Sequence, residues 1–196
     1  MKFLTYIKYF YFLFINWDTR IAWYMIKQEI KGEKKYGINT TGADELHKLE
    51  KLGIDISHAT IYMPVSYTLL EEIFEQLPVT IRNHFLDIGS GKGRALCVAA
   101  HQGFKQVTGL DFFKNDAFYF EIPDDVDCIF FFNPFDEIIM SAVVNNIFTS
   151  LQNKPRRISI LYVNPLHKAL FLKAGFTETW YSKKMKYIEA VILEIA

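Results

Sequence analysis

"FLDIGSGKGRALCVAA", residues 85–100, carries the clearest structural signal in the chain. Three glycines, Gly89, Gly91 and Gly93, lie between an apolar run and an alanine-rich run. This order predicts a buried strand, a tight turn and a helix, because glycine adopts positive φ and lets the backbone approach a ligand closely. The N-terminus of such a helix presents free N–H groups and a positive dipole end to the turn. The turn is therefore a predicted binding site for a ligand that contains a nucleoside.

The spacing of the glycines argues against two common nucleotide motifs. The turn has the pattern G-x-G-x-G, whereas the dinucleotide fingerprint is G-x-G-x-x-G and the phosphate-binding loop is G-x-x-x-x-G-K-[ST]. Asp87 lies two residues before the first glycine, and Asp111 ends the next predicted strand, "VTGLD". A carboxylate at Asp87 opposes a pyrophosphate but suits a cation. These features point to S-adenosylmethionine, with Asp111 placed to accept both ribose hydroxyls.

Strand and helix patterns alternate from residue 84 to the end of the chain. Four apolar runs have the length and composition of buried parallel strands: 84–89, 106–111, 127–132 and 157–163. Three helical patterns separate or follow them: 92–102, 135–152 and 166–175. Two alternating runs, 176–181 and 186–195, predict an antiparallel hairpin joined by the polar residues 182–185. The sum is an α/β, Rossmann-like, doubly wound and mostly parallel sheet, with an antiparallel C-terminal hairpin and a helical N-terminal extension.

The N-terminal 36 residues predict two helical segments, with Asp18 or Thr19 as the N-cap of the second, and 38–54 predict a loop and a short helix. The first segment is apolar and aromatic, but it is shorter than the roughly 20 residues of a bilayer span and it carries Lys8. It also lacks the small-residue cleavage site of a signal peptide. Two interpretations remain open. The helix packs its aromatic side chains on the domain or on a second copy, or residues 1–30 lie in a membrane interface.

Length and composition predict one domain with an extension, divided into a helical part, 1–58, and a ligand-binding domain, 59–196. The 22 basic and 22 acidic residues balance, so no global field attracts nucleic acid. Cys97 and Cys128 lie in apolar runs and predict reduced thiols in a cytoplasmic protein, with membrane association as the open alternative. The histidines have no metal-binding spacing, so no metal site is expected.

The glycine turn followed by "VTGLD" resembles the class I S-adenosylmethionine-dependent methyltransferases, over about residues 60–195. More narrowly, the chain is similar to a group of bacterial methyltransferases with unassigned substrates. Four further stretches carry that likeness: "YGINTTG" (36–42), "IYMPVSY" (61–67), "FFFNPFDE" (130–137) and "PRRISILYVNP" (155–165). The resemblance implies an enzyme with S-adenosylmethionine as its cofactor.

The resemblance also implies roles for particular residues. The cofactor-binding set comprises Asp87, Gly89, Ser90, Gly91 and Gly93 around the methionine end, Asp111 at the ribose, Asp116 and Ala117 at the adenine, and Tyr62 and Pro64 in the wall over the cofactor. The catalytic set is Asn133, Pro134 and Phe135, which resembles the [DN]-P-P-[YF] motif of methyltransferases that act on nitrogen, with one proline fewer.

The reaction expected from this motif is methyl transfer to a nitrogen of a protein or small molecule, the acceptor being unknown. The side-chain oxygen of Asn133 would aim the lone pair of the nitrogen, and Phe135 would stack on a planar group. A strand-ending turn is the alternative for this motif, because Asn-Pro is common in turns. For the similar pair Asn164-Pro165 we favour the structural interpretation. A different class of function also stays open, a non-catalytic S-adenosylmethionine-binding scaffold whose aromatic N-terminus binds a partner or a membrane surface.

The chain departs from the family between Asp111 and Asp116. Family members place a helix and a strand between these two positions, whereas only residues 112–115 separate them here. Either one short helix within 112–126 makes the return to the sheet, which then loses an edge strand, or a stretch is missing near 112–115. We favour the missing stretch, because Asp111 and the pair Asp116-Ala117 are intact on either side.

Overall fold

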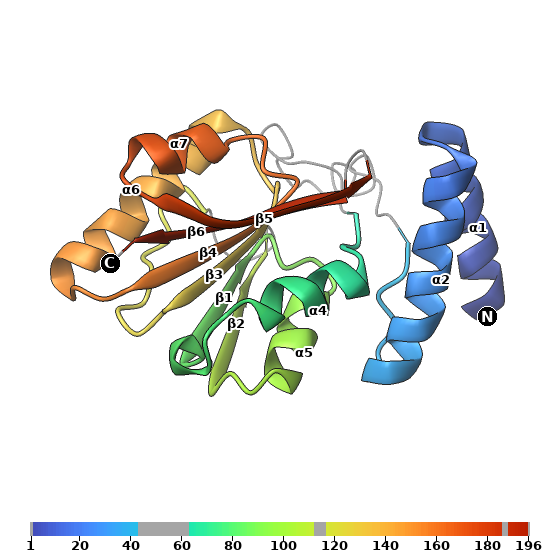
Figure 1. The fold of residues 1–196 in the computed structure, drawn as a ribbon, viewed down its shortest axis with the longest axis horizontal. Helices are drawn as coiled ribbons and strands as arrows, with labels where there is room; N and C mark the ends of the chain where they lie inside the picture. Colours follow the sequence, from blue (N-terminus) through green and yellow to red (C-terminus); the bar gives the residue numbers. More distant parts are fainter. Residues whose placement is uncertain (1, 43–62, 112–116, 186–187, 196) are drawn as a thin grey trace.

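The computed structural model describes residues 2–42, 63–111, 117–185 and 188–195 (Figure 1). At its centre is a six-stranded sheet with the order β2-β1-β3-β4-β6-β5. The strands are β1 (His84–Ile88), β2 (Gln106–Leu110), β3 (Cys128–Phe132), β4 (Ile158–Val163), β5 (Thr177–Met185) and β6 (Ile188–Ile195). The first four pair in parallel, and β6 runs antiparallel to both β4 and β5. This confirms the predicted Rossmann-like α/β fold with its antiparallel C-terminal hairpin.

Helices cover both faces of the sheet. They are α1 (Lys2–Asn16), α2 (Thr19–Tyr36), α4 (Tyr67–Glu75), α5 (Arg94–His101), α6 (Glu137–Asn153) and α7 (Lys168–Lys173), with a short 3₁₀ helix η1 (Val79–Ile81). In Figure 1, α4 and α5 lie on one face of the sheet and α6 and α7 on the other, while α1 lies beyond α2 at one end of the molecule. Within the described ranges, no helix combines the length and apolarity needed to cross a bilayer.

The N-terminal helices begin and end where local sequence signals place them. Asp18 caps α2, because its Oδ1 accepts a hydrogen bond from the backbone N–H of Ile21 at 2.8 Å. This confirms one of the two predicted caps. The helix ends at Gly37, whose φ of 69° lies in the left-handed region. The short helix predicted within 38–54 and the predicted domain boundary at 58–59 fall mainly or wholly outside the described residues.

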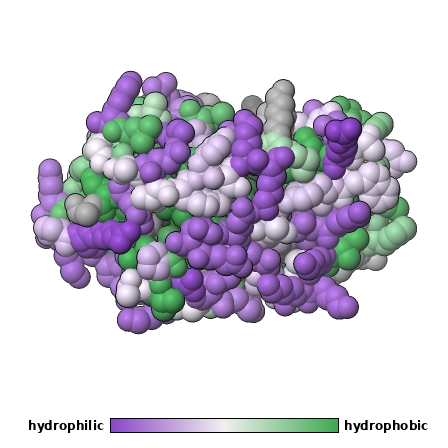
Figure 2. Space-filling view, viewed as in Figure 1, coloured by the Kyte–Doolittle hydropathy of each residue, from purple (hydrophilic) through white to green (hydrophobic). Residues whose placement is uncertain are grey.

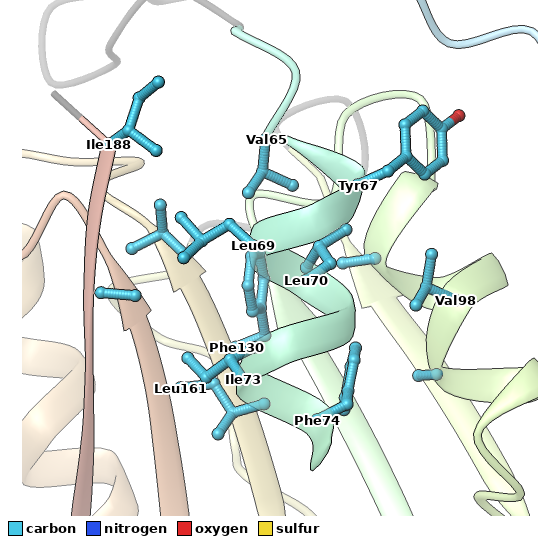
Figure 3. Close-up of a cluster of buried hydrophobic side chains, with 14 of the residues drawn as sticks. Val65, Tyr67, Leu69, Leu70, Ile73, Phe74, Val98, Phe130, Leu161 and Ile188 are labelled. Carbon is cyan, nitrogen blue, oxygen red and sulfur yellow. The ribbon is translucent and has the colours of Figure 1, made fainter. Parts of the chain in front are cut away.

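Helix α4 packs its apolar side chains in a cluster shared by the sheet and the N-terminal helices. Leu69, Leu70, Ile73 and Phe74 recur at helical spacing in the sequence, and all four are buried. Figure 3 shows them between α5 and the central strands, with Phe130 and Leu161 of the sheet nearby. Each such side chain contributes about 1.5–3 kcal/mol when it is fully buried. The same apolar cluster includes buried residues of α1 and α2, so these helices share a core with the sheet.

The prediction that residues 182–185 form a polar linker is wrong. They continue β5 to Met185, opposite β6. Polar side chains are compatible with an edge strand, and here they have partners. Lys183 forms an ion pair with Glu189 at 3.0 Å, and Ser182 donates a hydrogen bond to Glu72 at 3.1 Å. Lys184 also forms an ion pair with Glu72.

Strand β2 is one of the two edges of the sheet among the described residues, and β5 is the other. The additional outer strand expected of the family is therefore not seen within these residues. Residues 112–116, where the chain departs from the family pattern, lie outside the described part. The shortened connection and the missing stretch both stay predictions.

Gly32 lies in the middle of α2, where glycine ordinarily destabilises a helix by roughly 0.5–1 kcal/mol relative to alanine. Here a Cβ atom would lie 2.1 Å from two ring carbons of Tyr67. That ring is buried and stacks on Tyr36 with the centroids 5.6 Å apart. We therefore expect Gly32→Ala to lower the free energy of unfolding by about 1–3 kcal/mol in urea titrations. Lys31→Ala, on the exposed side of the same helix, is the control; a stabilised Gly32→Ala variant would contradict the prediction.

Candidate functional site

The glycine turn folds over the end of β2. The backbone N–H groups of Gly89 and Ser90 both donate to the carbonyl oxygen of Leu110, at 2.9 and 3.0 Å. Gly89, Gly91 and Gly93 have φ values of 86°, 50° and 74°, so the turn uses conformations that favour glycine. Asp111 follows Leu110 directly. The structure therefore brings the predicted turn residues and this carboxylate together at the carboxyl edge of the parallel strands.

Asp87 lies beside this turn as a buried carboxylate. It is the fourth residue of β1, between β2 and β3, and is only 2% exposed. Within the described part of the chain, no group donates a hydrogen bond to its side chain. Burial, and secondly the charge of Asp111, raise the pKa of Asp87 to about 8. A cation bound beside it would stabilise the ionised form.

The loop after β3 packs directly on the glycine turn. A Cβ atom on Gly89 would lie 2.5 Å from Cβ of Pro134, so only glycine allows this approach. Asn133 precedes Pro134 and has a left-handed φ of 40°, which is rare for a residue other than glycine. The structure thus brings the predicted catalytic pair next to the predicted cofactor turn.

The side chain of Asn133 is held in place by Tyr162 of β4. The Tyr162 hydroxyl accepts a hydrogen bond from the backbone N–H of His167 at 3.3 Å and donates its own hydrogen to Oδ1 of Asn133 at 3.2 Å. Burial raises the pKa of Tyr162 to about 12, so the hydroxyl keeps that hydrogen at neutral pH. Tyr162 was not singled out from the sequence, where its one signal is a phenol hydroxyl near the carboxyl end of a mainly apolar strand.

A cavity of about 290 Å³ lies between the sheet and the N-terminal helices. Of the fourteen described residues that line it, eleven are apolar and none is charged: Leu13, Trp17, Ile21, Met25, Met63, Pro64, Val65, Ser66, Leu69, Phe132, Asn133, Val163, Asn164 and Ile188. We call this the apolar cavity. A molecule that fits it is itself mainly apolar and uncharged, because burying a charge without a partner is unfavourable.

Residues with different predicted roles line the apolar cavity together. Pro64, assigned by resemblance to a wall over the cofactor, lines it together with Asn133. Asn164 lines it as well, with a left-handed φ of 48°. The two Asn-Pro pairs thus end neighbouring strands with the same unusual backbone conformation. The structural interpretation of the pair Asn164-Pro165 stays a prediction, since a left-handed φ also fits a strand-ending turn.

Other predicted site residues lie elsewhere or cannot be placed. Phe135 is only 7% exposed and belongs to the apolar cluster with Ile139 and Met140 of α6. This burial leaves little ring surface for stacking, so the structure does not support that role. Ala117 is buried in the same cluster. Tyr62 and Asp116 lie outside the described residues.

A buried ion pair between Arg94 and Glu29 joins α2 to the helix that follows the glycine turn. It was not predicted from the sequence. Arg94 begins α5 directly after Gly93, and Arg94 and Glu29 of α2 are 2% and 0% exposed. The guanidinium donates to both carboxylate oxygens of Glu29, one of them at 2.6 Å from Nη1. It also donates to Oγ1 of Thr40 and the carbonyl of Val65, at 2.8 and 2.6 Å.

Glu33 extends this network through the "YGINTTG" stretch. Its carboxylate accepts the backbone N–H groups of Thr40 and Thr41, at 2.8 and 2.9 Å, and the hydroxyl of Tyr6 at 2.7 Å. Burial acts to raise its pKa, but the hydrogen bonds from Thr41 and Tyr6 outweigh that effect and lower the pKa of Glu33. An ionised Glu33 therefore holds this loop against α1 and α2.

Comparisons with solved structures agree with the fold described above. No family model matches the chain, and no curated protein matches its sequence. Among solved structures, it is similar to a SAM-dependent methyltransferase from Aquifex aeolicus, with a TM-score of 0.52 and 17% identity over 78% of this chain and 100% of that one. A protein from Thermoplasma acidophilum gives a TM-score of 0.44 and 17% identity over 65% of this chain and 81% of its own. The likeness to the first shows that this chain has the same fold as that methyltransferase.

Proposed function

We propose that the protein is an S-adenosylmethionine-dependent methyltransferase that transfers a methyl group to a nitrogen atom of a protein or small molecule. The observation that carries the proposal is Asp87, a buried carboxylate without a hydrogen-bond donor among the described residues, beside a glycine turn and a second carboxylate. Such a site fits a nucleoside ligand that carries positive charge. It fits a pyrophosphate poorly, because Asp111 would repel it and an anion would not stabilise the ionised form of Asp87.

The residues of the turn would hold the cofactor from three sides. Asp87 would offset the positive charge, Asp111 would accept hydrogen bonds from the ribose, and the backbone at Gly89 and Gly91 would approach the ligand closely. S-adenosylmethionine, when bound, supplies a methyl group already activated by the sulfonium. The work of the chain is then to orient the acceptor and to exclude water, and alignment of this kind supplies about 7–11 kcal/mol.

Asn133 is the residue best placed to orient the acceptor. It lines the apolar cavity, while its neighbour Pro134 contacts the glycine turn, so it joins the two compartments. Tyr162 fixes the orientation of its amide. A nitrogen nucleophile needs a free lone pair, and a cavity with no charged side chain among its described lining residues favours the neutral form of that nitrogen.

Asn133→Ala is expected to lower the rate of methyl transfer about 100-fold, because a displaced acceptor loses much of the alignment effect. The affinity for S-adenosylmethionine should stay within about threefold of the original, a change of under 1 kcal/mol. The measurement pairs transfer from tritiated S-adenosylmethionine to a lysate, which also shows the acceptor class, with calorimetry on the pure protein. Asn153→Ala, an exposed position at the end of α6, is the control. If Asn133→Ala instead loses cofactor affinity, Asn133 belongs to the cofactor site.

The alternative proposal, a cofactor-binding scaffold without catalysis, is favoured by one observation. Helix α1 exposes large apolar side chains that suit contact with a partner. Turnover separates the two functions: a scaffold binds S-adenosylmethionine in calorimetry but labels nothing in the lysate.

A further inference from the structure

Helix α1 is apolar on both of its sides. Its inner side buries Tyr9 and Leu13 in the core. Its other side carries six large apolar side chains that are 37–75% exposed: Phe3, Leu4, Ile7, Tyr11, Phe14 and Ile15. With 3.6 residues per turn, these positions fall on one stripe of the helix. We call this stripe the outer face of α1; contiguous exposed apolar surface of this kind marks an interaction site.

The outer face continues onto α2 and there meets a row of cations. Phe10 of α1 contacts Trp23 of α2, with ring centroids 5.1 Å apart, and Trp23 is also exposed. The exposed side of α2 carries four basic residues: Arg20, Lys27, Lys31 and Lys34. Lys8 of α1 is exposed as well. None of these five cations forms an ion pair with a residue that the structure describes.

The positive charge of this surface is a local property. The whole chain has a formal net charge of zero. Of the three acidic residues within 2–36, Glu29 and Glu33 are buried in the network described above, and Asp18 caps α2. Figure 2 shows hydrophobic and hydrophilic side chains next to one another at the end of the molecule formed by α1 and α2.

We propose that this surface docks on an anionic lipid bilayer, with α1 lying in the plane of the interface. Apolar and aromatic side chains bordered by lysine and arginine are the chemistry of helices that lie in a membrane interface. Tyr11 and Trp23 combine apolar rings with a polar group, which suits the headgroup region. At 15 residues, α1 is too short to span the hydrocarbon core.

The charges argue against a second copy of the chain as the occupant. A two-fold interface places the same patch on both partners, so five unpaired cations on each would face an equal set and repel. Leu13, which lines the apolar cavity, lies on the inner side of α1. Docking would therefore hold that cavity close to the lipid. The proposal itself does not depend on methyl transfer.

The test measures sedimentation of the full chain with vesicles of phosphatidylcholine alone and of phosphatidylcholine mixed with phosphatidylglycerol. We expect binding at least tenfold tighter to the anionic vesicles, weakened by added salt. The double variant Phe14→Ser/Ile15→Ser should lose at least tenfold in affinity. The double variant Lys27→Glu/Lys31→Glu should lose the preference for anionic lipid.

Matched controls lie on other surfaces. Leu166→Ser removes an apolar side chain that is 65% exposed, and Lys105→Glu reverses an exposed cation; both should bind as the unmodified chain does. Circular dichroism checks that each variant is folded, which is expected because the altered side chains are exposed. Equal binding to both vesicles, or no effect of the outer-face variant, would overturn the proposal. So would a concentration-dependent dimer, in analytical ultracentrifugation, that the outer-face variant abolishes.

Discussion

Asp87→Asn is expected to weaken S-adenosylmethionine binding about 100-fold, since a buried hydrogen bond to a charged group contributes about 1.5–3 kcal/mol. The ligand-free variant should nevertheless be more stable than the unmodified protein at pH 8, by about 1–3 kcal/mol. Both effects have one cause: without a ligand, the folded chain buries a carboxylate that no described residue stabilises. Calorimetry measures the affinity, and thermal unfolding without ligand measures the stability.

The pH dependence of stability and of cofactor affinity gives a second comparison between Asp87→Asn and the unmodified protein. The pKa of Asp87 is about 8 in the folded protein, against 3.8 for a free side chain. Between these values the folded state holds a proton that the unfolded state has released, so the ligand-free protein loses stability as the pH rises from about 4 to 8. A bound cation favours the ionised form, so binding should release a proton and strengthen over the same range. Asp87→Asn should show neither trend, and its retention of both would contradict the assignment.

The same calorimetry also tests which class of cofactor the protein binds. If reduced or oxidised nicotinamide dinucleotide binds the unmodified protein tightly and S-adenosylmethionine releases no heat, the cofactor site is misassigned. Asp111→Asn provides a comparison, because it removes the neighbouring charge that contributes to the raised pKa of Asp87. This variant should lower that pKa yet weaken cofactor binding through the ribose.

Arg94→Leu and Glu29→Leu, made singly, are each expected to lower the free energy of unfolding by about 3–5 kcal/mol, because each leaves the other charge buried without its partner. The double variant removes both charges and should recover the larger part of that loss. Its recovery is incomplete, since Thr40 and the carbonyl of Val65 also lose their donor. Urea unfolding of the four proteins gives the coupling energy directly.

The exposed pair of Lys168 and Glu178, at 2.8 Å, is the matched control. Surface ion pairs contribute about 0–1 kcal/mol, so Lys168→Ala should change little. If Arg94→Leu also changes the stability by less than about 1 kcal/mol, the buried network does not hold α2 to the glycine turn as argued. Because Arg94 begins the helix that follows the turn, the single variants that remain folded should also bind S-adenosylmethionine more weakly.

Much of the fold followed from local patterns. The apolar runs of β1 to β4 and the helical spacing along α4 depend on near neighbours in the chain, as do the cap at Asp18 and the positive φ of Gly89. The hairpin was predicted too, but its extent was not. Polar residues 182–185 matched a turn in composition, and partners on β6 and α4 place them in β5 instead.

The candidate site was predictable only in part. Asp87, the glycine turn and Asp111 are brought together because parallel strands end at one edge of the sheet, and the sequence shows where each strand ends. Glu29 and Glu33 lie in a stretch rich in lysine, whose composition does not show that they are buried. Arg94 looked like one more basic residue after the turn. Nothing local distinguishes them from surface charges.

Local sequence patterns alone predict the order of the elements, the conformation of the turn, and the carboxylates at two successive strand ends. These depend on backbone sterics and on side-chain periodicity, which act within a few residues. The tertiary structure alone decided which charges are buried, as for Arg94 and Glu29, which are 65 residues apart in the chain. It also decided which asparagines share the apolar cavity. Burial depends on distant segments meeting and excluding water, and the energy of a charge depends on that exclusion.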